Sequence, residues 1–185
     1  MNKEKRIKLV LIGHSGTGKT IFVENLKKGY NKLNFKNNYS TIGATYAPLD
    51  LIYNNTEFKI DIWDTAGREY FTTMLSMFTR DSDIIFVFYD SKYKKSFERA
   101  KFLYESAKSN NSNNNCIYAL ISNKYDLNSY PNEKDDIISD EEVLEFVEEN
   151  NLIFAHLSIL EKYSQGVIEL FKKVFKEYSK IKNSV

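Results

Sequence analysis

Cysteine is nearly absent from this chain, and it has neither a long hydrophobic run nor an excess of one charge. The single cysteine, Cys116, excludes an intrachain disulfide and fits a reducing compartment such as the cytosol. No apolar run approaches the ~18–20 residues that cross a bilayer. Lysine and arginine number 26 against 25 aspartate and glutamate, a formal charge of +1, so an electrostatic grip on nucleic acid is not expected. We therefore expect a cytoplasmic protein without a nucleic-acid partner.

Signals for a secretory leader or a lipid anchor are also missing. Residues 1–6 (MNKEKR) form no apolar segment, and position 2 is not the glycine of myristoylation. The final residues, 181–185, offer no cysteine for a prenyl group, so no direct lipid anchor is expected. A length of 185 residues with a hydrophobic share of 42% fits one core. We expect a monomeric single domain over residues 1–185, with flexible ends at 1–5 and 181–185.

Apolar runs alternate with amphipathic stretches, which is typical of an α/β fold with a mostly parallel sheet. The runs predict strands at Ile7–Ile12, Thr45–Tyr53, Glu57–Trp63, Asp83–Tyr89, Cys116–Ile121 and Leu152–Leu157. The second and third of these flank two asparagines, which favour a tight antiparallel hairpin. Pro48 cannot donate to a sheet ladder, so it predicts that the first hairpin strand lies at the sheet edge.

Helices are predicted from about Lys19, over Ser96–Ser109, after Ser139 and at the carboxyl end. Ser139 and Glu142 have the spacing of a capping box, which starts a helix. The last helix shows an apolar stripe with helical spacing, which predicts a core face: Val167, Leu170, Phe171, Val174, Phe175 and Tyr178. The polar tract Asn110–Asn115 is interpreted as a solvated surface loop.

A phosphate-binding loop stands out between the first predicted strand and helix. Residues 13–20, GHSGTGKT, fit the pattern G-x-x-x-x-G-K-[ST] in the context that this motif requires. Glycines let the backbone curl around phosphate oxygens with its N–H groups turned inward, and the helix N-terminus adds positive charge. Lys19 would bridge the β- and γ-phosphates, and the Thr20 hydroxyl would ligate Mg²⁺.

The remaining loop residues, His14, Ser15, Gly16, Thr17 and Gly18, are assigned to nucleotide binding through this cradle. His14 is interpreted as a spectator and not as an acid or base. Ser15 either touches the γ-phosphate and its water or is simply a small residue that the loop tolerates. The motif predicts a nucleoside triphosphate without saying which base it carries.

The base is predicted by a second motif, Asn123-Lys124-Tyr125-Asp126, which follows a predicted strand. A carboxylate such as that of Asp126 accepts hydrogen bonds from guanine N1–H and the exocyclic N2–H₂, a donor pair that adenine lacks. Asn123 is expected to tie this segment to the phosphate loop, and the Lys124 stem to cover one face of the base. A nucleotide kinase that uses ATP would leave these residues unexplained.

With these motifs, the sequence resembles the Ras superfamily of small GTPases, closest in pattern to its Rab branch, over about residues 6–180. Residues 39–43 (YSTIG) resemble its first switch and 63–67 (WDTAG) the start of its second. The resemblance implies that Thr41 completes Mg²⁺ coordination when a γ-phosphate is present and that Asp64 holds a magnesium-bound water. It also implies that the Gly67 amide contacts the γ-phosphate and that Phe35 packs against the base.

The implied architecture is the P-loop small G-protein fold. It consists of a six-stranded, mostly parallel sheet with one antiparallel edge strand, flanked by about five helices. The implied function is a switch that binds GTP or GDP with Mg²⁺ and hydrolyses GTP. Its partners would be effectors, exchange factors and GTPase-activating proteins that read the switch regions, with a Rab-like role in vesicle trafficking. Ile42 and Trp63 are candidate effector contacts, and Trp63 is equally well explained as core.

Position 68 departs from the family pattern, because Arg68 replaces the usual glutamine after Asp-Thr-Ala-Gly. That glutamine orients the attacking water by offering an acceptor and a donor together, whereas guanidinium has only donors. We therefore expect slow intrinsic hydrolysis, with Lys19, Thr41, Gly67 and Arg68 as the catalytic set. The alternative is a hydrolysis-deficient scaffold.

The loop that usually backs the base is degenerate, reading LSILEK over residues 157–162. Either Ser158 occupies the serine position or Lys162 the lysine position, since the spacing does not allow both. The segment between Thr20 and Thr41 is about three residues longer than the family norm, which either reshapes the first switch or lengthens a surface loop. Without a lipidated tail, the chain is either a piece of a longer protein or a protein that reaches the cytosolic face of endomembranes through partners.

Overall fold

The computed structural model describes residues 6–28, 35–37, 45–53, 56–65, 74–125, 138–158 and 164–183. Four predicted site residues lie outside these ranges: Thr41, Gly67, Arg68 and Asp126. For Phe35 the structure describes the backbone but not the side chain. Their predicted roles therefore remain predictions.

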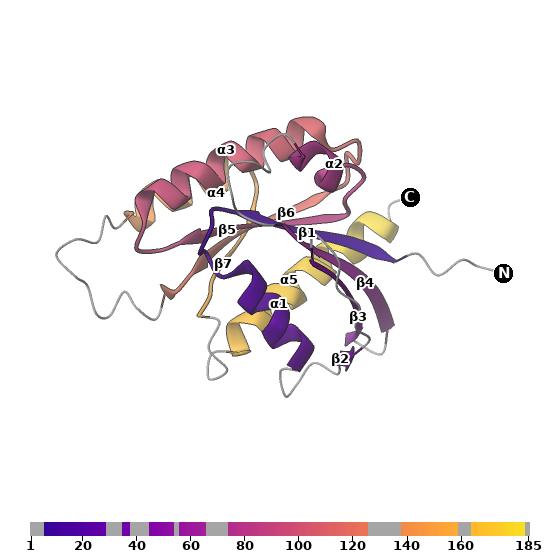
Figure 1. Ribbon diagram of the computed structural model, residues 1–185. Helices are drawn as coiled ribbons and strands as arrows, with labels where there is room; N and C mark the ends of the chain where they lie inside the picture. The colour runs from indigo at the N-terminus through magenta and orange to yellow at the C-terminus, as the bar shows by residue number, and fades with distance from the viewer. Residues whose placement is uncertain are drawn as a thin grey trace.

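A seven-stranded sheet forms the middle layer of the molecule (Figure 1), in the order β2-β3-β4-β1-β5-β6-β7. β1 pairs in parallel with β4 and β5, and β6 continues the parallel arrangement between β5 and β7. β3 is antiparallel to both β2 and β4. The strands are β1 (Ile7–Gly13), β2 (Phe35–Asn37), β3 (Thr45–Tyr53), β4 (Thr56–Asp64), β5 (Ile84–Asp90), β6 (Ile117–Asn123) and β7 (Ile153–His156).

All six predicted strands are present in this sheet, together with the expected hairpin of β3 and β4. The short strand β2 was not predicted, since three residues are too few for a periodic pattern. β2 pairs with residues 49–51, so β2 and not β3 takes the outer position there. Pro48 lies just past the end of that pairing, so β2 needs no backbone N–H donor at this position.

Five helices flank the described sheet, as the family pattern implies (Figure 1). α1 (Lys19–Lys28) and α5 (Ser164–Asn183) cover one face. α2 (Leu75–Thr79), α3 (Lys94–Asn110) and α4 (Asp140–Glu149) cover the other. α2 was not predicted because one turn leaves little periodicity to detect. α5 continues beyond residue 181, and Ile181 packs against the core, although a flexible end was expected from that residue.

The two faces of the sheet build two hydrophobic cores. Along β1, Leu9 and Leu11 face the core under α1 and α5, while Val10 and Ile12 face the core under α3 and α4. β5 is buried on both faces in the same way, which explains why its sequence reads as one continuous apolar run. All six residues of the predicted apolar stripe on α5 are buried.

Phenylalanine dominates the core under α1 and α5. Phe22, Phe86, Phe88, Phe171 and Phe175 form one cluster, with contacting ring centroids 5.3–6.4 Å apart. Such pairs contribute beyond their buried area. The cluster fixes α1 and α5 on the sheet, and α1 carries the end of the phosphate loop.

The start of α4 shows half of the predicted capping box. The Ser139 Oγ accepts a hydrogen bond from the Glu142 N–H at 3.2 Å. The Glu142 carboxylate, however, lies 3.3 Å from the Lys101 ammonium and 3.6 Å from that of Lys94, both on α3. Glu142 therefore ties α4 to α3.

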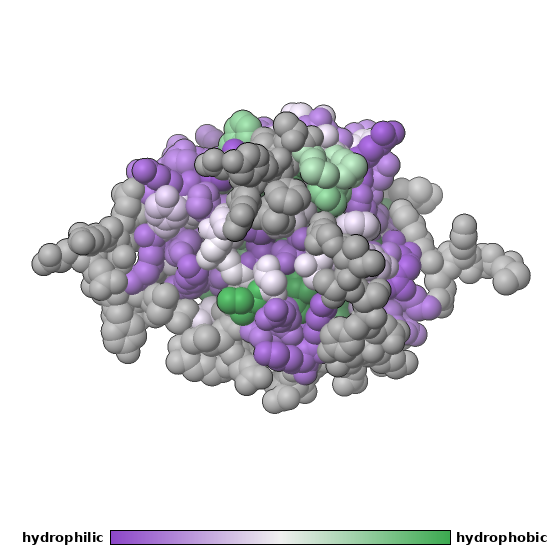
Figure 2. Space-filling model, in the orientation of Figure 1, coloured by the Kyte–Doolittle hydropathy of each residue, from purple (hydrophilic) through white to green (hydrophobic). Residues whose placement is uncertain are grey.

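None of the helices within the described ranges has the length and apolar character needed to span a membrane. On the face in Figure 2 the described surface is mainly hydrophilic, and apolar residues appear in small separate areas. That face therefore offers no broad apolar surface for a partner among the residues described.

We predict that Phe171→Ala lowers the free energy of unfolding by about 3–5 kcal/mol, because it removes a ring that is 1% exposed and leaves a cavity. The matched control is Phe102→Ala on α3, whose side chain is 51% exposed and should cost less than about 1 kcal/mol. Urea unfolding followed by circular dichroism measures both. Equal losses for the two variants would contradict the placement of the core.

Candidate functional site

The predicted site residues gather where parallel strands end. β1 leads into the phosphate loop, β4 ends at Asp64, β5 at Asp90 and β6 at Asn123. These strands are parallel neighbours, so their carboxyl ends lie at one edge of the sheet. In open α/β sheets this edge is where ligands bind.

Two glycines allow the phosphate loop to take its shape. Gly13 has a φ of 148°, and a Cβ there would lie 2.3 Å from the Phe88 carbonyl oxygen of β5. Gly16 has a φ of 80° and would place a Cβ in open space. Gly13 is thus required by packing against β5, while Gly16 is required by its left-handed backbone.

Lys19 organises the loop from inside. Its ammonium donates to the carbonyl oxygens of Gly13 and His14, each at 2.9 Å, and the residue is only 5% exposed. Burial lowers the pKa of Lys19 to about 8. Because these carbonyls turn towards the lysine, the loop amides are left for another acceptor. Within the described parts, the N–H groups of Ser15, Gly16 and Gly18 have none.

The two predicted magnesium residues of the described chain touch each other. The Thr20 hydroxyl donates to Asp64 Oδ2 at 2.6 Å. Burial raises the pKa of Asp64, while the Thr20 hydrogen bond and the nearby Lys19 charge oppose that rise. A divalent cation at this place would favour the ionised carboxylate.

Three buried side-chain atoms in the described residues lack a hydrogen-bond partner: Asp64 Oδ1, Asn123 Oδ1 and Ser158 Oγ. Each such atom costs about 1–3 kcal/mol, so native structures keep few of them. All three belong to residues that the sequence assigns to the metal or the nucleotide. The residues present therefore fit a ligand that supplies the missing partners.

The described ranges hold no group of three or more His, Cys, Asp or Glu side chains suited to a metal ion. The predicted set has one carboxylate, Asp64, and the hydroxyls of Thr20 and Thr41, so such a group is not required for it. Mg²⁺ keeps several waters and takes few protein carboxylates when phosphates share its coordination. Thr20 and Asp64 are thus the described residues that would hold it.

The predicted tie between the two motifs is present. The Asn123 side-chain amide donates to the Thr17 carbonyl oxygen at 2.6 Å, across 106 positions of sequence. Asn123 is 2% exposed, so this hydrogen bond is shielded from water. It fixes the end of β6 against the phosphate loop, which sets the distance between a phosphate and a base.

Lys124 and Asp90 form an ion pair that sequence reasoning missed. The Lys124 ammonium lies 2.6 Å from Asp90 Oδ2, and Lys124 itself has a φ of 61°, which is uncommon outside glycine. The pair holds the lysine stem along the carboxyl edge of the sheet, where it was expected to cover the base. The sequence could have indicated Asp90 as a site residue, because it ends an apolar strand just as Asp64 does.

Tyr125 and His156 are further residues that the sequence did not single out. Their ring centroids lie 4.0 Å apart with the ring planes tilted by 38°, and the Tyr125 N–H donates to the Leu157 carbonyl oxygen at 3.1 Å. Ser158 follows directly and is 7% exposed. These contacts bring the segment that includes Ser158 beside the segment that precedes Asp126. Lys162 lies outside the described residues.

His14 points along the outside of the loop. Its ring packs edge-on against Tyr93 with centroids 5.5 Å apart, and its Nδ1 lies 2.7 Å from the Ser15 carbonyl oxygen. Neither contact gives it a carboxylate or nucleophile to act on. The interpretation of His14 as a spectator to the chemistry therefore agrees with its surroundings.

A glycine loop around a buried lysine, a hydroxyl paired with a buried carboxylate, and free loop amides together define a P-loop protein of the nucleoside-triphosphate-binding class. A comparison with protein families narrows the class, since the Ras family model matches residues 8–180.

Individual relatives agree with that match. The chain is 35% identical over 180 residues to the Ras-related protein Rab-5A of Dictyostelium discoideum, covering 97% of this chain and 84% of that protein. It is 32% identical over 183 residues to the Ras-related protein Rab-5B of Plasmodium falciparum, covering 97% and 82%. It is 36% identical over 170 residues to the Ras-related protein RHN1 of Nicotiana plumbaginifolia, covering 91% and 79%. The chain therefore belongs to the Ras family and is a Rab-like small GTPase.

We predict that nucleotide binding takes up a proton near pH 8 through Lys19. The free site holds the lysine pKa at about 8, and a bound phosphate raises that pKa by its opposite charge. Lys19 is then partly neutral before binding at that pH and charged afterwards, whereas well below pH 8 it is charged throughout. Calorimetry of nucleotide binding in buffers of different ionisation enthalpy measures the uptake. The same uptake by Lys19→Met would assign it to another group.

Proposed function

We propose that this chain is a guanine-nucleotide switch that binds GTP or GDP with Mg²⁺ and hydrolyses GTP slowly. Ras-family GTPases bind guanine nucleotide with Mg²⁺ in general, and this chain's membership supports the same ligands. The observation that carries the proposal is the cluster of unsatisfied groups at the carboxyl edge of the sheet. The loop amides and Asp64 Oδ1 have no partner among the described residues, and the buried Lys19 ammonium beside them carries positive charge, so together they suit a phosphate–metal ligand.

Each residue of the cradle has a distinct task in this proposal. The loop amides and Lys19 hold the phosphates, and the lysine stabilises the negative charge that develops during phosphoryl transfer to water. Thr20 and Asp64 hold Mg²⁺, which neutralises phosphate charge when bound. Thr41 and Gly67 sense the γ-phosphate, so the two switches order with GTP and are released on hydrolysis.

Guanine selection is assigned to Asp126 in this proposal. The hydrogen bond from Asn123 to Thr17 supports this assignment because it anchors the start of the same segment to the phosphate loop. A carboxylate placed there rejects adenine, which offers no matching donor pair and would leave a buried acceptor unpaired. Ser158 and the Lys124 stem complete the base site.

Arg68 is the reason for proposing slow hydrolysis. An attacking water needs an acceptor to orient it, and the guanidinium group has five donors and no acceptor. Arg68 keeps a positive charge at this position of the motif, so the proposal does not require weaker nucleotide binding. We propose a GTP-bound state of long lifetime.

The proposed trafficking role rests on resemblance to Rab proteins, as the names of the relatives suggest. A half-buried aromatic cluster next to the switch sequences supports a partner surface there. Trp63 is partly buried against the core, and its ring lies 5.3 Å from that of Tyr46 and 6.2 Å from that of Phe78. We propose that effectors read this cluster and that the chain acts on the cytosolic face of endomembranes through such partners.

The alternative function is a scaffold that binds GTP without turning it over. Arg68 and the degenerate segment after Leu157 favour it, whereas the intact contact between Thr20 and Asp64 favours a working metal site. The two functions differ in a single measurable property, which is turnover of bound GTP.

We predict that Arg68→Gln accelerates single-turnover GTP hydrolysis by about tenfold or more, because glutamine restores an acceptor for the water. Arg68→Lys is the matched control, since lysine keeps the charge and also lacks an acceptor, and it should stay slow. If the glutamine variant is no faster than the wild type, Arg68 is not the cause of slow turnover. If neither protein turns over while both bind GTP, the scaffold function holds.

A further inference from the structure

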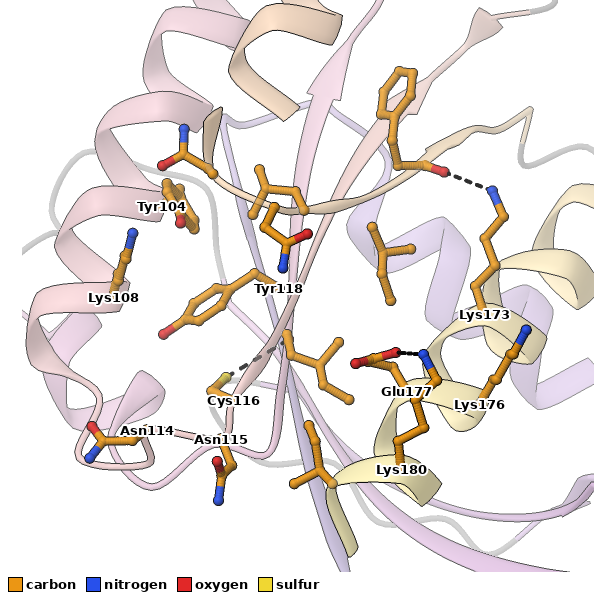
Figure 3. Close-up of a pocket in the computed structure, with 17 residues that line it drawn as sticks. Tyr104, Lys108, Asn114, Asn115, Cys116, Tyr118, Lys173, Lys176, Glu177 and Lys180 are labelled. Atoms are coloured by element: carbon orange, nitrogen blue, oxygen red, sulfur yellow. Dashed lines mark hydrogen bonds and ion pairs between the residues drawn. The ribbon is translucent and has the colours of Figure 1, made fainter. Parts of the chain in front are cut away.

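A second pocket lies at the opposite end of the sheet from the nucleotide site. Its floor and sides include the first residues of β6 and β7, Ile117 and Ile153, whereas the nucleotide site lies where these strands end. The pocket has a volume of about 780 Å³ and is framed by α3, α5 and the turn before β7 (Figure 3). This size suits a compact ligand and not an extended peptide.

Positive charge is concentrated around this pocket. Its lining includes four lysines and one acidic residue, Glu177, a local charge of about +3 in a chain whose formal charge is +1. The lysines come from two walls: Lys108 from α3, and Lys173, Lys176 and Lys180 from α5 (Figure 3). Lys180 pairs with Glu177 at 2.8 Å, and the Lys173 ammonium donates to the Phe154 carbonyl oxygen at 3.3 Å (Figure 3).

Lysines near the carboxyl end of a helix are usually explained by the helix dipole, but this explanation covers only two of the four lysines. Lys108 and Lys180 lie in the last turns of α3 and α5, where a cation offsets the helix dipole. Lys173 and Lys176 lie in the middle of α5, where no such effect applies. Lys176 makes no hydrogen bond or ion pair with any residue in the described ranges.

The ends of α3 and α4 also reach this pocket, and free carbonyls there would repel an anion. At each end one of these carbonyl oxygens already accepts a hydrogen bond. The Asn111 N–H donates to the Ala107 carbonyl oxygen at 3.0 Å, and the Asn150 side-chain amide donates to that of Phe146 at 2.9 Å. The lysines therefore set the sign of the local potential.

The asparagine tract after α3 is an ordered rim of the pocket, and this gives a role to a segment that the sequence suggested only as a surface loop. Asn111 and Asn113 both donate through their side chains to the Ser82 carbonyl oxygen at 3.1 Å. The next two residues, Asn114 and Asn115, line the pocket. Their side chains make no hydrogen bond to the described residues, so two amide groups remain available at the rim.

The floor of the pocket is neutral. Burial raises the pKa of the Cys116 thiol to about 12 and raises that of the Tyr118 hydroxyl, so neither is ionised at neutral pH. Figure 3 shows both between the α3 and α5 walls. No carboxylate of the lining besides Glu177 competes with an incoming anion.

We infer that this pocket binds a compact ligand carrying two or more phosphate groups. Ammonium groups on two facing walls suit charges on both sides of one ligand, and a singly charged anion would engage only one wall. Lysine serves as a point charge for phosphate, and the rim amides add neutral donors. The ligand is either a free polyphosphate or a phosphorylated lipid headgroup, which share this chemistry. The pocket lies away from the phosphate loop, so this inference does not depend on the proposed function.

The test uses the full chain with Mg²⁺ and GDP, titrated with inositol hexakisphosphate while backbone amide signals are followed by NMR. We expect saturable shifts at residues 114–118 and 150–154. Lys108→Gln combined with Lys176→Gln should weaken binding by about tenfold or more. The matched control, Lys95→Gln with Lys172→Gln, removes the same charge from the same two helices outside the pocket and should change affinity less than about twofold.

Further arms identify the source of the phosphates. Vesicles of phosphatidylcholine with and without phosphatidylinositol 4,5-bisphosphate are compared with the soluble ligand. Binding to the phosphoinositide vesicles indicates a lipid headgroup, and binding of the soluble ligand alone indicates a free polyphosphate. The inference is overturned if both double variants weaken binding equally, if the shifts map to residues 13–20 instead, or if polyglutamate binds as tightly. Since signals from the two places are separate, the result stands whether or not GDP occupies the phosphate loop.

Discussion

The Lys19 ammonium inside the phosphate loop is the interaction on which the rest of the site depends. It donates hydrogen bonds to the carbonyl oxygens of Gly13 and His14 and so turns them inward. The loop amides are thereby left facing a ligand, and the loop ends on the first turn of α1. Burying an ammonium group is unfavourable, as its lowered pKa indicates, and a bound phosphate would remove that penalty. The loop is thus held in this shape at a desolvation cost that a bound phosphate would offset.

Both polar sites of the molecule also depend on β6, because one lies at each end of this strand. At its carboxyl end Asn123 is fixed to the phosphate loop through Thr17, which sets the frame for base recognition. At its amino end Ile117 and Tyr118 contribute to the lysine-rich pocket. The middle of the strand is buried in both cores, so the strand holds the two polar ends apart as a rigid element. A ligand at one end need not displace a ligand at the other.

Much of the fold and of the phosphate site was predictable, because the signals are local. The strand, loop and helix around residues 13–20 follow each other directly, and the continuous apolar run of β5 indicates burial on both faces. Thr20 and Asp64 were each assigned to magnesium from the sequence, and the structure adds the contact between them. By contrast, β2 and α2 are too short to show a period, and pairing with β3 or packing on α3 fixes them instead.

The ion pair of Lys124 with Asp90 and the ring contact of Tyr125 with His156 were missed for a different reason. They join separate strand ends, and a single sequence does not show which ends meet. The prediction of a capping box at Ser139 was half right. The Glu142 carboxylate pairs with lysines on α3, and only the tertiary structure brings those lysines near it. The ordered rim formed by the asparagine tract escaped prediction for the same cause, since its anchor is the Ser82 carbonyl far back in the chain.

The central claim is that one cradle holds the phosphates while a separate carboxylate selects guanine. Calorimetry with Mg²⁺ that compares GDP with ADP tests it most directly. The account predicts that GDP binds at least about a hundredfold more tightly, because adenine would leave the Asp126 acceptor unpaired. Equal affinities for the two nucleotides would contradict it.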